Sequence, residues 1–248
     1  MKVISFSALL LLAFFATAQA QEPVPLARGN TPGEPHHHLK FENEYVRVYY
    51  VEVPRHEETQ LHQHDHDYIY VSLGASEVVN AILNKPEIHL QLKDGETHFT
   101  RGGFAHVARN LADTPFCNIT IELLRPQREA RNVCGPVVLD VGFAVCDPVL
   151  GPRSGWTEFE TADARLDHVW LSSKRKYEQK TSNLSFLVVG LSGSEIKINT
   201  KGNSRKTLRE GQIEWFDPGS DVQFSCEGCE TAQFLKLSFK DSARRAKP

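Results

Sequence analysis

The sequence lacks several features that mark common classes of function. Beyond residue 20 it has no apolar run close to the roughly 20 residues that a membrane-spanning helix needs. It has no phosphate-binding glycine loop, no dinucleotide fingerprint and no recognisable nucleophile triad. Its net charge is −3, and its basic residues occur only in short stretches, such as the three arginines of residues 125–131 and the tail of residues 242–248, which argues against nucleic acid as a partner. It also lacks a helical period of useful length, which favours an all-β fold.

The first twenty residues have the pattern of a cleaved secretory signal. Met1-Lys2 gives a basic start, an apolar run follows, and Ala18-Gln19-Ala20 gives a small-x-small exit. The alternative is a retained N-terminal anchor. No cysteine stands at the cleavage site, so we expect no lipid attachment there. We therefore predict a secreted or periplasmic protein without membrane contact after cleavage.

The five cysteines agree with export, because disulfides persist in oxidising compartments. The sequence-local pairs are Cys134 with Cys146 and Cys226 with Cys229. The second pair has a spacing that redox and zinc sites also use. No helix-like pattern follows it, so we favour a plain disulfide. The odd count leaves at least one thiol over.

Two sets of short strand-like runs, separated by turn signals, lie on either side of Gly135-Pro136. Phe41-Glu42 matches Phe159-Glu160 at an offset of 118 residues, and Gly95 matches Gly211 at an offset of 116. Near-constant offsets indicate an internal duplication. Periodicity alone leaves tandem sandwiches and tandem barrels open. The predicted parts are a signal peptide (1–20), a flexible lead-in (21–38), a first β unit (39–125), a linker (126–136), a second β unit (137–241) and a basic tail (242–248).

The strand predicted at residues 116–124 alternates cleanly between two faces. Its odd-numbered positions are mostly apolar, whereas Asn118, Thr120 and Glu122 form a polar face. That polar face either lines a cavity or is an ordinary wet outer face.

Eleven histidines are present, and only His168 lies in the second half. His62, His64 and His66 recur at a spacing of two, which places them on the same side of an extended strand. Neutral imidazole is a common ligand for Zn, Mn, Fe, Ni and Cu. His106 is the best further ligand, because it follows a turn and precedes a short strand. Residues 36–38, also histidines, either close over a barrel mouth or form a solvated lead-in, and we favour the lead-in.

These residues resemble the motifs of the cupin family. Its first motif contains His-x-His followed by Glu and Gly, and its second is Gly-x5-Pro-x-Gly-x2-His-x3-Asn. The matching positions are His62, His64, Gly95, Gly103, His106 and Asn110, with Arg101 in place of the proline. The resemblance covers about residues 39–240. It implies two tandem cupin-type jelly-roll barrels, a bicupin, with one divalent metal ion held by His62, His64 and His106 in the first barrel.

The sequence departs from the family at the carboxylate ligand. Tyr68 takes that place by count, and Asp67 serves only if the strand shifts by one residue. His66 is a substitute ligand or a rim residue. A three-histidine site with water, or with Tyr68 as a weak neighbour, favours Zn, Fe, Ni or Cu, and the resemblance also allows Mn. The alternative is a decayed cupin whose histidines hold no metal.

The second half lacks the histidines. By sequence offset, Lys180 stands for His62, Ser182 for His64, Phe186 for Tyr68 and Val222 for His106. No imidazole site is expected there. We therefore interpret this half as a structural or homodimer-forming partner.

Two functions follow from the resemblance. Cupins with such sites include dioxygenases, isomerases, decarboxylases and lyases that act on small molecules. In that hypothesis Tyr68 donates or accepts a proton and Glu122 acts as a base. The alternative is a non-catalytic periplasmic module that binds or senses a small molecule or a metal, which the missing glutamate favours. A purely structural bicupin is a third hypothesis.

Overall fold

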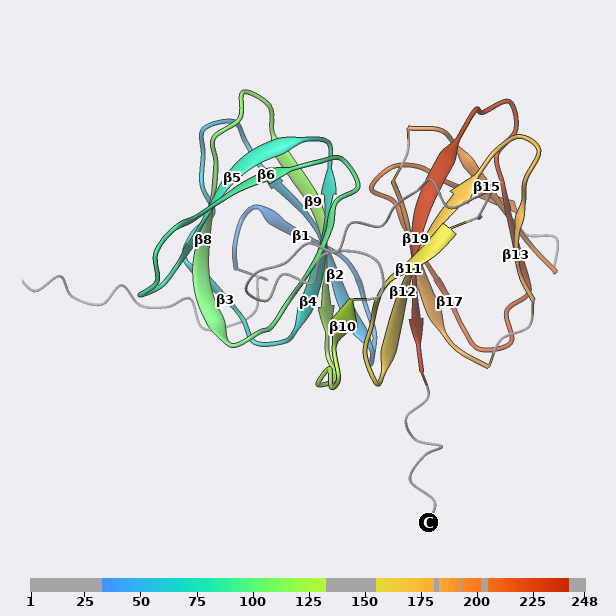
Figure 1. Ribbon diagram of the computed structural model, residues 1–248, viewed down its shortest axis with the longest axis horizontal. Coiled ribbons are helices and arrows are strands. Elements are labelled where there is room, and N and C mark those ends of the chain that lie inside the picture. Colours follow the sequence, from blue (N-terminus) through green and yellow to red (C-terminus); the bar gives the residue numbers. More distant parts are fainter. Residues whose placement is uncertain (1–32, 133–154, 181–182, 192, 202–204, 241–248) are drawn as a thin grey trace, which may run out of the picture.

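The computed structural model describes residues 33–132, 155–180, 183–191, 193–201 and 205–240. These residues fold into two β-barrels that lie side by side (Figure 1). The described part contains no helix and so none that is long and apolar enough to cross a membrane. The predicted all-β fold with two tandem jelly-roll barrels is confirmed.

The first barrel is built from two antiparallel sheets. Their strand orders are β1-β2-β9-β4-β7 and β3-β8-β5-β6. The strands are β1 (His37–Glu42), β2 (Val46–Val53), β3 (His62–His64), β4 (Tyr68–Leu73), β5 (Ser76–Ile82), β6 (Ile88–Leu92), β7 (Thr97–Thr100), β8 (Phe104–Asn110) and β9 (Phe116–Leu123). Strands that are distant in sequence are neighbours in both sheets, as in a jelly roll.

The second barrel repeats this plan. Its strand orders are β10-β11-β12-β19-β14-β17 and β13-β18-β15-β16. The strands are β10 (Arg131–Asn132), β11 (Gly155–Glu160), β12 (Ala164–Leu171), β13 (Tyr177–Gln179), β14 (Phe186–Gly190), β15 (Ile196–Thr200), β16 (Arg205–Leu208), β17 (Ile213–Phe216), β18 (Val222–Ser225) and β19 (Ala232–Phe239). Strand β10 pairs with β11, so the last described residues of the predicted linker belong to a sheet of the second barrel.

The strand register reproduces the internal duplication. Phe41 pairs with Val48 after a register shift in the β1–β2 ladder, and Phe159 pairs with Leu166 after the same shift in the β11–β12 ladder. Both residues of the second pair lie 118 positions after those of the first. Gly95 and Gly211 both have positive φ, at 71° and 70°, which explains why the matched turns need glycine.

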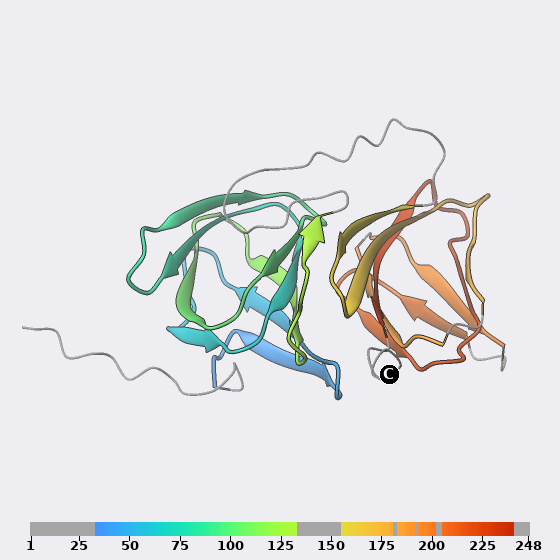
Figure 2. The same cartoon turned by 60° about the horizontal axis from the view of Figure 1, so that its bottom comes forward.

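A hydrophobic core joins the two barrels. Phe99 of β7 stacks on Phe159 of β11 with ring centroids 4.6 Å apart. The first barrel contributes Val46, Val48, Ile69, Val71, Ile119, Ile121 and Leu123, and the second contributes Leu166, Leu187, Val189, Leu235, Leu237 and Phe239. Full burial of each such side chain stabilises the fold by about 1.5–3 kcal/mol. The five-stranded sheet of the first barrel and the six-stranded sheet of the second therefore pack face to face between the barrels (Figure 2).

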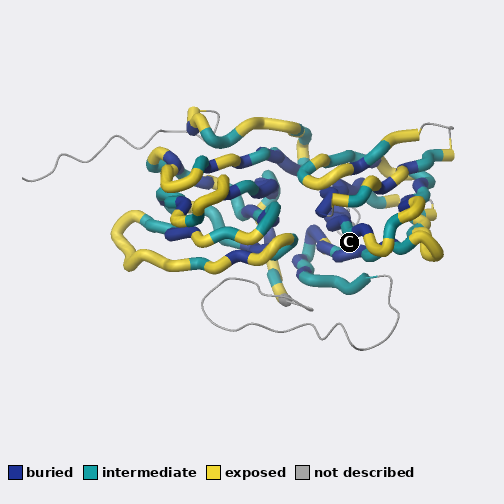
Figure 3. Tube along the Cα trace, turned by 90° about the horizontal axis from the view of Figure 1, so that it is seen from above, coloured by how far each residue is buried: buried dark blue, intermediate teal, exposed yellow. Residues whose placement is uncertain are grey.

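This packing shows which face of β9 points into the first barrel. Ile119 and Ile121 point outward from the first barrel into the shared core, so the polar face with Asn118 and Thr120 points into the barrel. Buried segments run through the middle of the molecule, and exposed ones gather at its two outer ends (Figure 3). The polar face of β9 therefore lines the interior of the first barrel, and the alternative that it is an ordinary outer face is wrong.

One predicted disulfide is present, between Cys226 and Cys229 at the end of β18. Cys117 is not disulfide-bonded, and its sulfur accepts a hydrogen bond from the Tyr50 hydroxyl at 3.4 Å. The predicted signal peptide, the Cys134–Cys146 pair and the basic tail lie outside the described residues.

Candidate metal centre

Strands β3 and β8 bring three predicted histidines together inside the first barrel. His62 pairs directly with His106, and His64 follows on the same face of β3. The ring centroids lie 4.5 Å apart for His62 and His106, 5.0 Å for His62 and His64, and 5.4 Å for His64 and His106. All three are buried. The predicted convergence of these imidazoles is therefore present.

Hydrogen bonds fix two of the rings with one nitrogen free. His62 Nδ1 donates to the carbonyl of Gln60 at 2.8 Å, and His106 Nδ1 donates to Asn80 Oδ1 at 2.8 Å. Both Nε2 atoms are buried and have no hydrogen-bond partner among the described residues. A buried polar atom without a partner costs about 1–3 kcal/mol. A metal ion at this point would remove that cost, so these residues fit the ion that the cupin resemblance implies.

The third ring is held by a buried carboxylate. His64 Nδ1 donates to Glu122 Oε1 at 3.1 Å, and the other carboxylate oxygen accepts from Arg47 Nη1 at 3.3 Å. Glu122 is fully buried behind His64 and does not line the cavity. Burial raises its pKa, against the opposing effect of Arg47. Glu122 thus positions His64 without lining the cavity itself, and its role as a base stays a prediction.

The environment keeps the imidazoles neutral. Burial lowers the pKa of His62 and of His64 to about 3, and it lowers the pKa of His106 well below its ordinary value. Neutral imidazole is the form that binds metals. The three rings therefore need no deprotonation at neutral pH before they can act as ligands.

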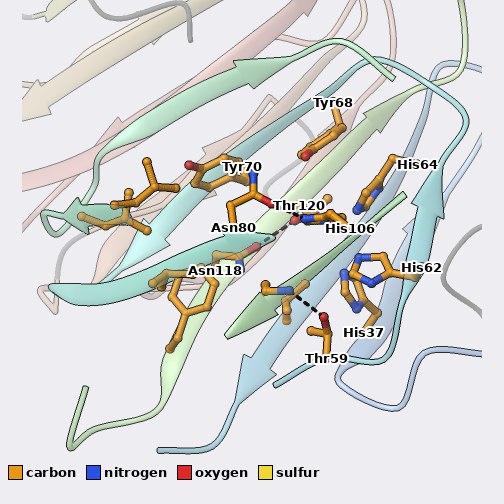
Figure 4. Close-up of a pocket in the computed structure, with 16 residues that line it drawn as sticks. His37, Thr59, His62, His64, Tyr68, Tyr70, Asn80, His106, Asn118 and Thr120 are labelled. Carbon is orange, nitrogen blue, oxygen red and sulfur yellow. Dashed lines mark hydrogen bonds between the residues drawn. The ribbon is translucent and has the colours of Figure 1, made fainter. Parts of the chain in front are cut away.

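A fourth histidine, His37 of β1, lies against this cluster, which the sequence analysis did not predict. Its ring centroid is 4.7 Å from that of His62 and 5.9 Å from that of His64. One ligand atom from each of these three residues lies within 4.8 Å of the others. His106 falls outside that particular limit, yet its ring is closer to His64 than the ring of His37 is. We therefore treat all four rings as one cluster (Figure 4).

The expectation that residues 36–38 form a solvated lead-in is wrong for His37. Its side chain is only 4 % exposed, and its Nδ1 lies 2.5 Å from Glu34 Oε2. The alternative, in which these histidines close over the barrel mouth, is nearer to the structure for His37, which reaches the site through the pairing of β1 with β2. Only His38 fits the earlier expectation, since it is exposed.

Two of the predicted additional ligands lie elsewhere. Asp67 accepts hydrogen bonds from Arg101 Nη1 at 2.7 Å and from the Gly102 amide at 3.1 Å, so it holds the turn before β8. His66 does not line the cavity. Its backbone packs on Gly102 so closely that a Cβ there would lie 2.4 Å from the His66 carbonyl. Both residues thus shape the turn, and their roles as a substitute ligand (His66) and as a ligand after a strand shift (Asp67) stay predictions.

Tyr68 lies at the family's carboxylate position by count, and the face of its ring lies against the cluster. It stacks on His64 with centroids 4.3 Å apart and an interplanar angle of 26°. It is buried, and burial raises the pKa of its hydroxyl. At neutral pH Tyr68 is therefore a neutral phenol on the cavity wall rather than an anionic ligand.

The histidines stand at one end of a small cavity. Its volume is about 60 Å³, which is enough for a few water molecules at roughly 10–15 Å³ each. Polar lining comes from Tyr70, Asn80, Asn118 and Thr120, and the Thr120 hydroxyl donates to Asn118 Oδ1 at 2.8 Å (Figure 4). Asn118 and Thr120 therefore line the cavity, as one of the two sequence interpretations held.

The second barrel has no such site among its described residues. Val222 stands where His106 does, and it pairs with Gln179, which therefore takes the position of His62. The sequence offset had placed Lys180 there; the segment before β13 differs by one residue, so the register shifts. Ser182 lies outside the described residues. Apolar side chains fill the interior, and they include Phe186, Val188, Ile198, Phe224 and Phe234.

Comparisons with known proteins bear on the fold. No protein-family model and no curated sequence matches the chain. Solved structures that match include AerE from Microcystis aeruginosa, at 12% identity and a TM-score of 0.57, covering 84% of this chain and 99% of that one. A cupin 2 conserved barrel domain protein from Leptotrichia buccalis has 12% identity and a TM-score of 0.54 over 82% and 88% of the two chains. A salicylate 1,2-dioxygenase from Pseudoaminobacter salicylatoxidans has 11% identity and a TM-score of 0.56 over 79% and 68%. At these identities the likeness concerns the fold.

Proposed function

We propose that this protein, which has the tandem cupin fold, is an exported metal-dependent enzyme that acts on a small polar molecule in its first barrel. The observation that carries the proposal is the arrangement of His62, His64 and His106. Each ring has its Nδ1 bound to an acceptor and faces the same cavity. Such outer hydrogen bonds are the usual way in which proteins orient metal-binding histidines.

The donor set limits the ion. Imidazole nitrogens suit Fe(II), Zn, Ni and Cu, whereas Mn prefers oxygen ligands, and the family's carboxylate is absent here. When bound, such an ion supplies Lewis-acid chemistry and, if it is iron, redox chemistry. One structural neighbour is a salicylate 1,2-dioxygenase solved in adducts with gentisate. We therefore place iron and dioxygenase chemistry first among the reactions to test, on molecules of a few heavy atoms as well as on the neighbour's aromatic acids.

The chain's own groups would bind and orient the substrate. The hydroxyls of Tyr68 and Tyr70 stay protonated, because burial raises both pKa values, so they donate hydrogen bonds. Asn118 and Thr120 add polar groups on the same sheet, because β9 pairs with β4 and Thr120 is the ladder partner of Tyr70. Apolar side chains such as Val78, Leu90 and Phe116 complete the lining and exclude bulk water. A substrate of a few heavy atoms with one or two oxygens fits this lining.

A second candidate function has support from the same lining. Tyr68, Tyr70 and the three predicted histidine ligands are not poised to transfer protons near neutral pH, because burial raises the tyrosine pKa values and lowers the pKa values of these histidines. This favours the alternative of a non-catalytic module that captures a metal or a small ligand. Turnover separates the two functions, since both need the metal.

The test uses untagged protein, so that tag histidines bind no metal. Wild type, the double variant His62→Ala/His64→Ala and the control His89→Ala, which changes an exposed histidine, are purified in parallel. Metal content is measured by elemental analysis, and oxygen uptake is followed with Fe(II) and a panel that contains salicylate and gentisate. We expect about one ion per chain in wild type and control and little in the double variant. Equal metal in all three would refute the site, and bound iron without turnover would favour the binding module.

Export is part of the proposal and has separate support. The predicted signal peptide and the Cys226–Cys229 disulfide both suit an oxidising compartment. Mass spectrometry of the protein from its native cells gives the test. A mature N-terminus at Gln21 supports export, whereas an intact Met1 in the cytosolic fraction contradicts it.

A further inference from the structure

The three-histidine site lacks the anionic ligand of its family, and the structure presents another group in its place. We propose that His37 is the fourth ligand of the metal and that Glu34 is its positioning residue. This inference rests on the proposed function, because it concerns the same ion. Its consequence is a site with four imidazoles, one of which comes from the first strand of the barrel, β1.

The geometry of His37 matches that of the accepted ligand candidates. Its ligand atoms lie within 4.8 Å of those of His62 and His64, and its side chain is 4 % exposed. Its Nδ1 is bound to a Glu34 carboxylate oxygen at 2.5 Å, so Nε2 is the nitrogen left to bind an ion. The Glu34–His37 pair thus repeats the arrangement of Glu122 and His64, in which a buried carboxylate orients a ring.

Glu34 is itself held in place by several hydrogen bonds. The amide and Nδ1 of His36 each donate to its carboxylate at 2.8 Å, and the Gln60 amide donates at 3.2 Å. The Glu34 side chain is only 1 % exposed, so these donors fix its carboxylate beside His37 and next to the proposed cation.

Gln60 connects the supports of two rings. Its amide donates to Glu34, and its carbonyl accepts from His62 Nδ1. Strand β1 is fixed in turn by its ladder with β2, in which His37 pairs with Val51. His37 is thus a built-in part of the wall and not the end of a loose tail.

Four neutral imidazoles make a different site from three imidazoles and a carboxylate. Nitrogen donors favour Cu, Ni, Zn and Fe(II) over Mn and Mg. The negative charge that balances the ion then comes from Glu34, which contacts the ligand His37, rather than from a direct ligand of the ion. A substrate must therefore bind as an additional ligand or displace His37.

The test counts the nitrogens directly. Cu(II) serves as the probe metal, and electron paramagnetic resonance of the full-length mature protein reports the number of bound nitrogens through their hyperfine lines. We expect four nitrogens in wild type and in the control His38→Ala, whose exposed ring lies next to His37 in sequence. We expect three in His37→Ala, with an affinity lower by about 100-fold, and a return to four on addition of free imidazole. The Glu34→Gln variant should keep four nitrogens but lose about 10-fold in affinity, as for other outer supports of metal ligands.

The outcomes separate the two proposals. If wild type binds no metal at the histidine cluster, the proposed function and this inference both fail. If wild type binds metal and His37→Ala keeps its nitrogen count and affinity, the inference fails and the three-histidine function stands. Circular dichroism of each variant checks folding, and rescue by imidazole excludes a merely misfolded site. If Glu34→Gln leaves the affinity unchanged, Glu34 has no positioning role.

Discussion

The two barrels share one frame and have opposite interiors. At matched register positions, the first barrel has His106, Asn80 and Asn118 where the second has Val222, Ile198 and Phe234. The second interior is packed with apolar side chains, whereas the first keeps a cavity lined by polar ones. Buried polar groups cost stability unless they are satisfied. The second barrel therefore shows that the fold does not need the polar interior, so a function must account for it in the first.

The outer faces of the barrels, in contrast, serve the same purpose. Ile121 and Leu123 of the first barrel and Leu187 and Leu237 of the second all contribute to the core between them. The second barrel thus covers an apolar wall that would otherwise face water. This supports the structural role predicted for it. A homodimer remains a prediction.

The largest expected effect comes from giving the first barrel the interior of the second. The variant His106→Val/Asn80→Ile introduces the residues found at the matched positions and removes both partners of one hydrogen bond. We expect its metal affinity to fall by about 100-fold or more. Replacing both partners by apolar groups is nearly neutral for folding, so the metal-free variant should unfold within about 1 kcal/mol of the metal-free wild type. Metal titration and denaturant unfolding measure the two effects. An unchanged metal affinity would contradict the view that the polar interior of the first barrel serves metal binding.

The next effect tests the shared core. Leu187→Ala removes a fully buried side chain between the barrels. We expect the free energy of unfolding to fall by about 2–5 kcal/mol. The exposed Leu83→Ala, at 47% exposure, should change it by less than about 0.5 kcal/mol. Urea unfolding measures both. Similar values for the two variants would mean that the barrels do not support each other.

Acid should destabilise the metal-free protein through the first barrel. The pKa of His62 and of His64 is about 3 in the folded state, against 6.5 for an ordinary histidine. Between pH 3 and 6.5 the unfolded chain therefore binds more protons than the folded one. The stabilisation from these two neutral histidines is complete above pH 6.5 and is lost as pH drops toward 3. At pH 5 the loss is about 2 kcal/mol for each histidine. Unfolding at pH 7 and pH 5 measures it, and His62→Ala/His64→Ala should show a smaller difference. An equal difference in the variant would contradict the account.

The smallest effect concerns a lysine inside the second barrel. Lys236 takes the position of Thr120, is buried, and donates to Gln179 and to the Tyr177 hydroxyl. If this barrel is only structural, Lys236→Met should change stability by about 1 kcal/mol or less and should leave the metal affinity of the first barrel unchanged. A clear loss of metal affinity would show that the second interior takes part in function.

Local spacing was enough to predict part of the site. His62 and His64 alternate on one strand, so short-range geometry placed them on one face, and the resemblance to the cupin motifs placed His106 beside them. The duplication was equally visible, since each strand of the first barrel has its counterpart at a near-constant offset. These are properties of short segments, and a sequence records them directly.

Long-range pairing and burial account for the errors. His37 joins the site only because β1 folds back along β2 and Glu34 reaches Gln60. Glu122 was predicted as a base, but in the fold it accepts a hydrogen bond from His64 Nδ1 and so positions that ring. The polar face of β9 looked like an outer surface as much as a lining, because the sequence does not show that the second barrel covers the apolar face.

The central claim is that one metal ion sits at the histidine cluster of the first barrel and none in the second. Crystals of protein loaded with Co(II), measured at the cobalt absorption edge, test it most directly through anomalous scattering. The account predicts a single strong peak about 2.0–2.1 Å from the Nε2 atoms of His62 and His106, a normal metal–imidazole distance. No peak at that point, or peaks only at exposed histidines such as His89, would contradict it.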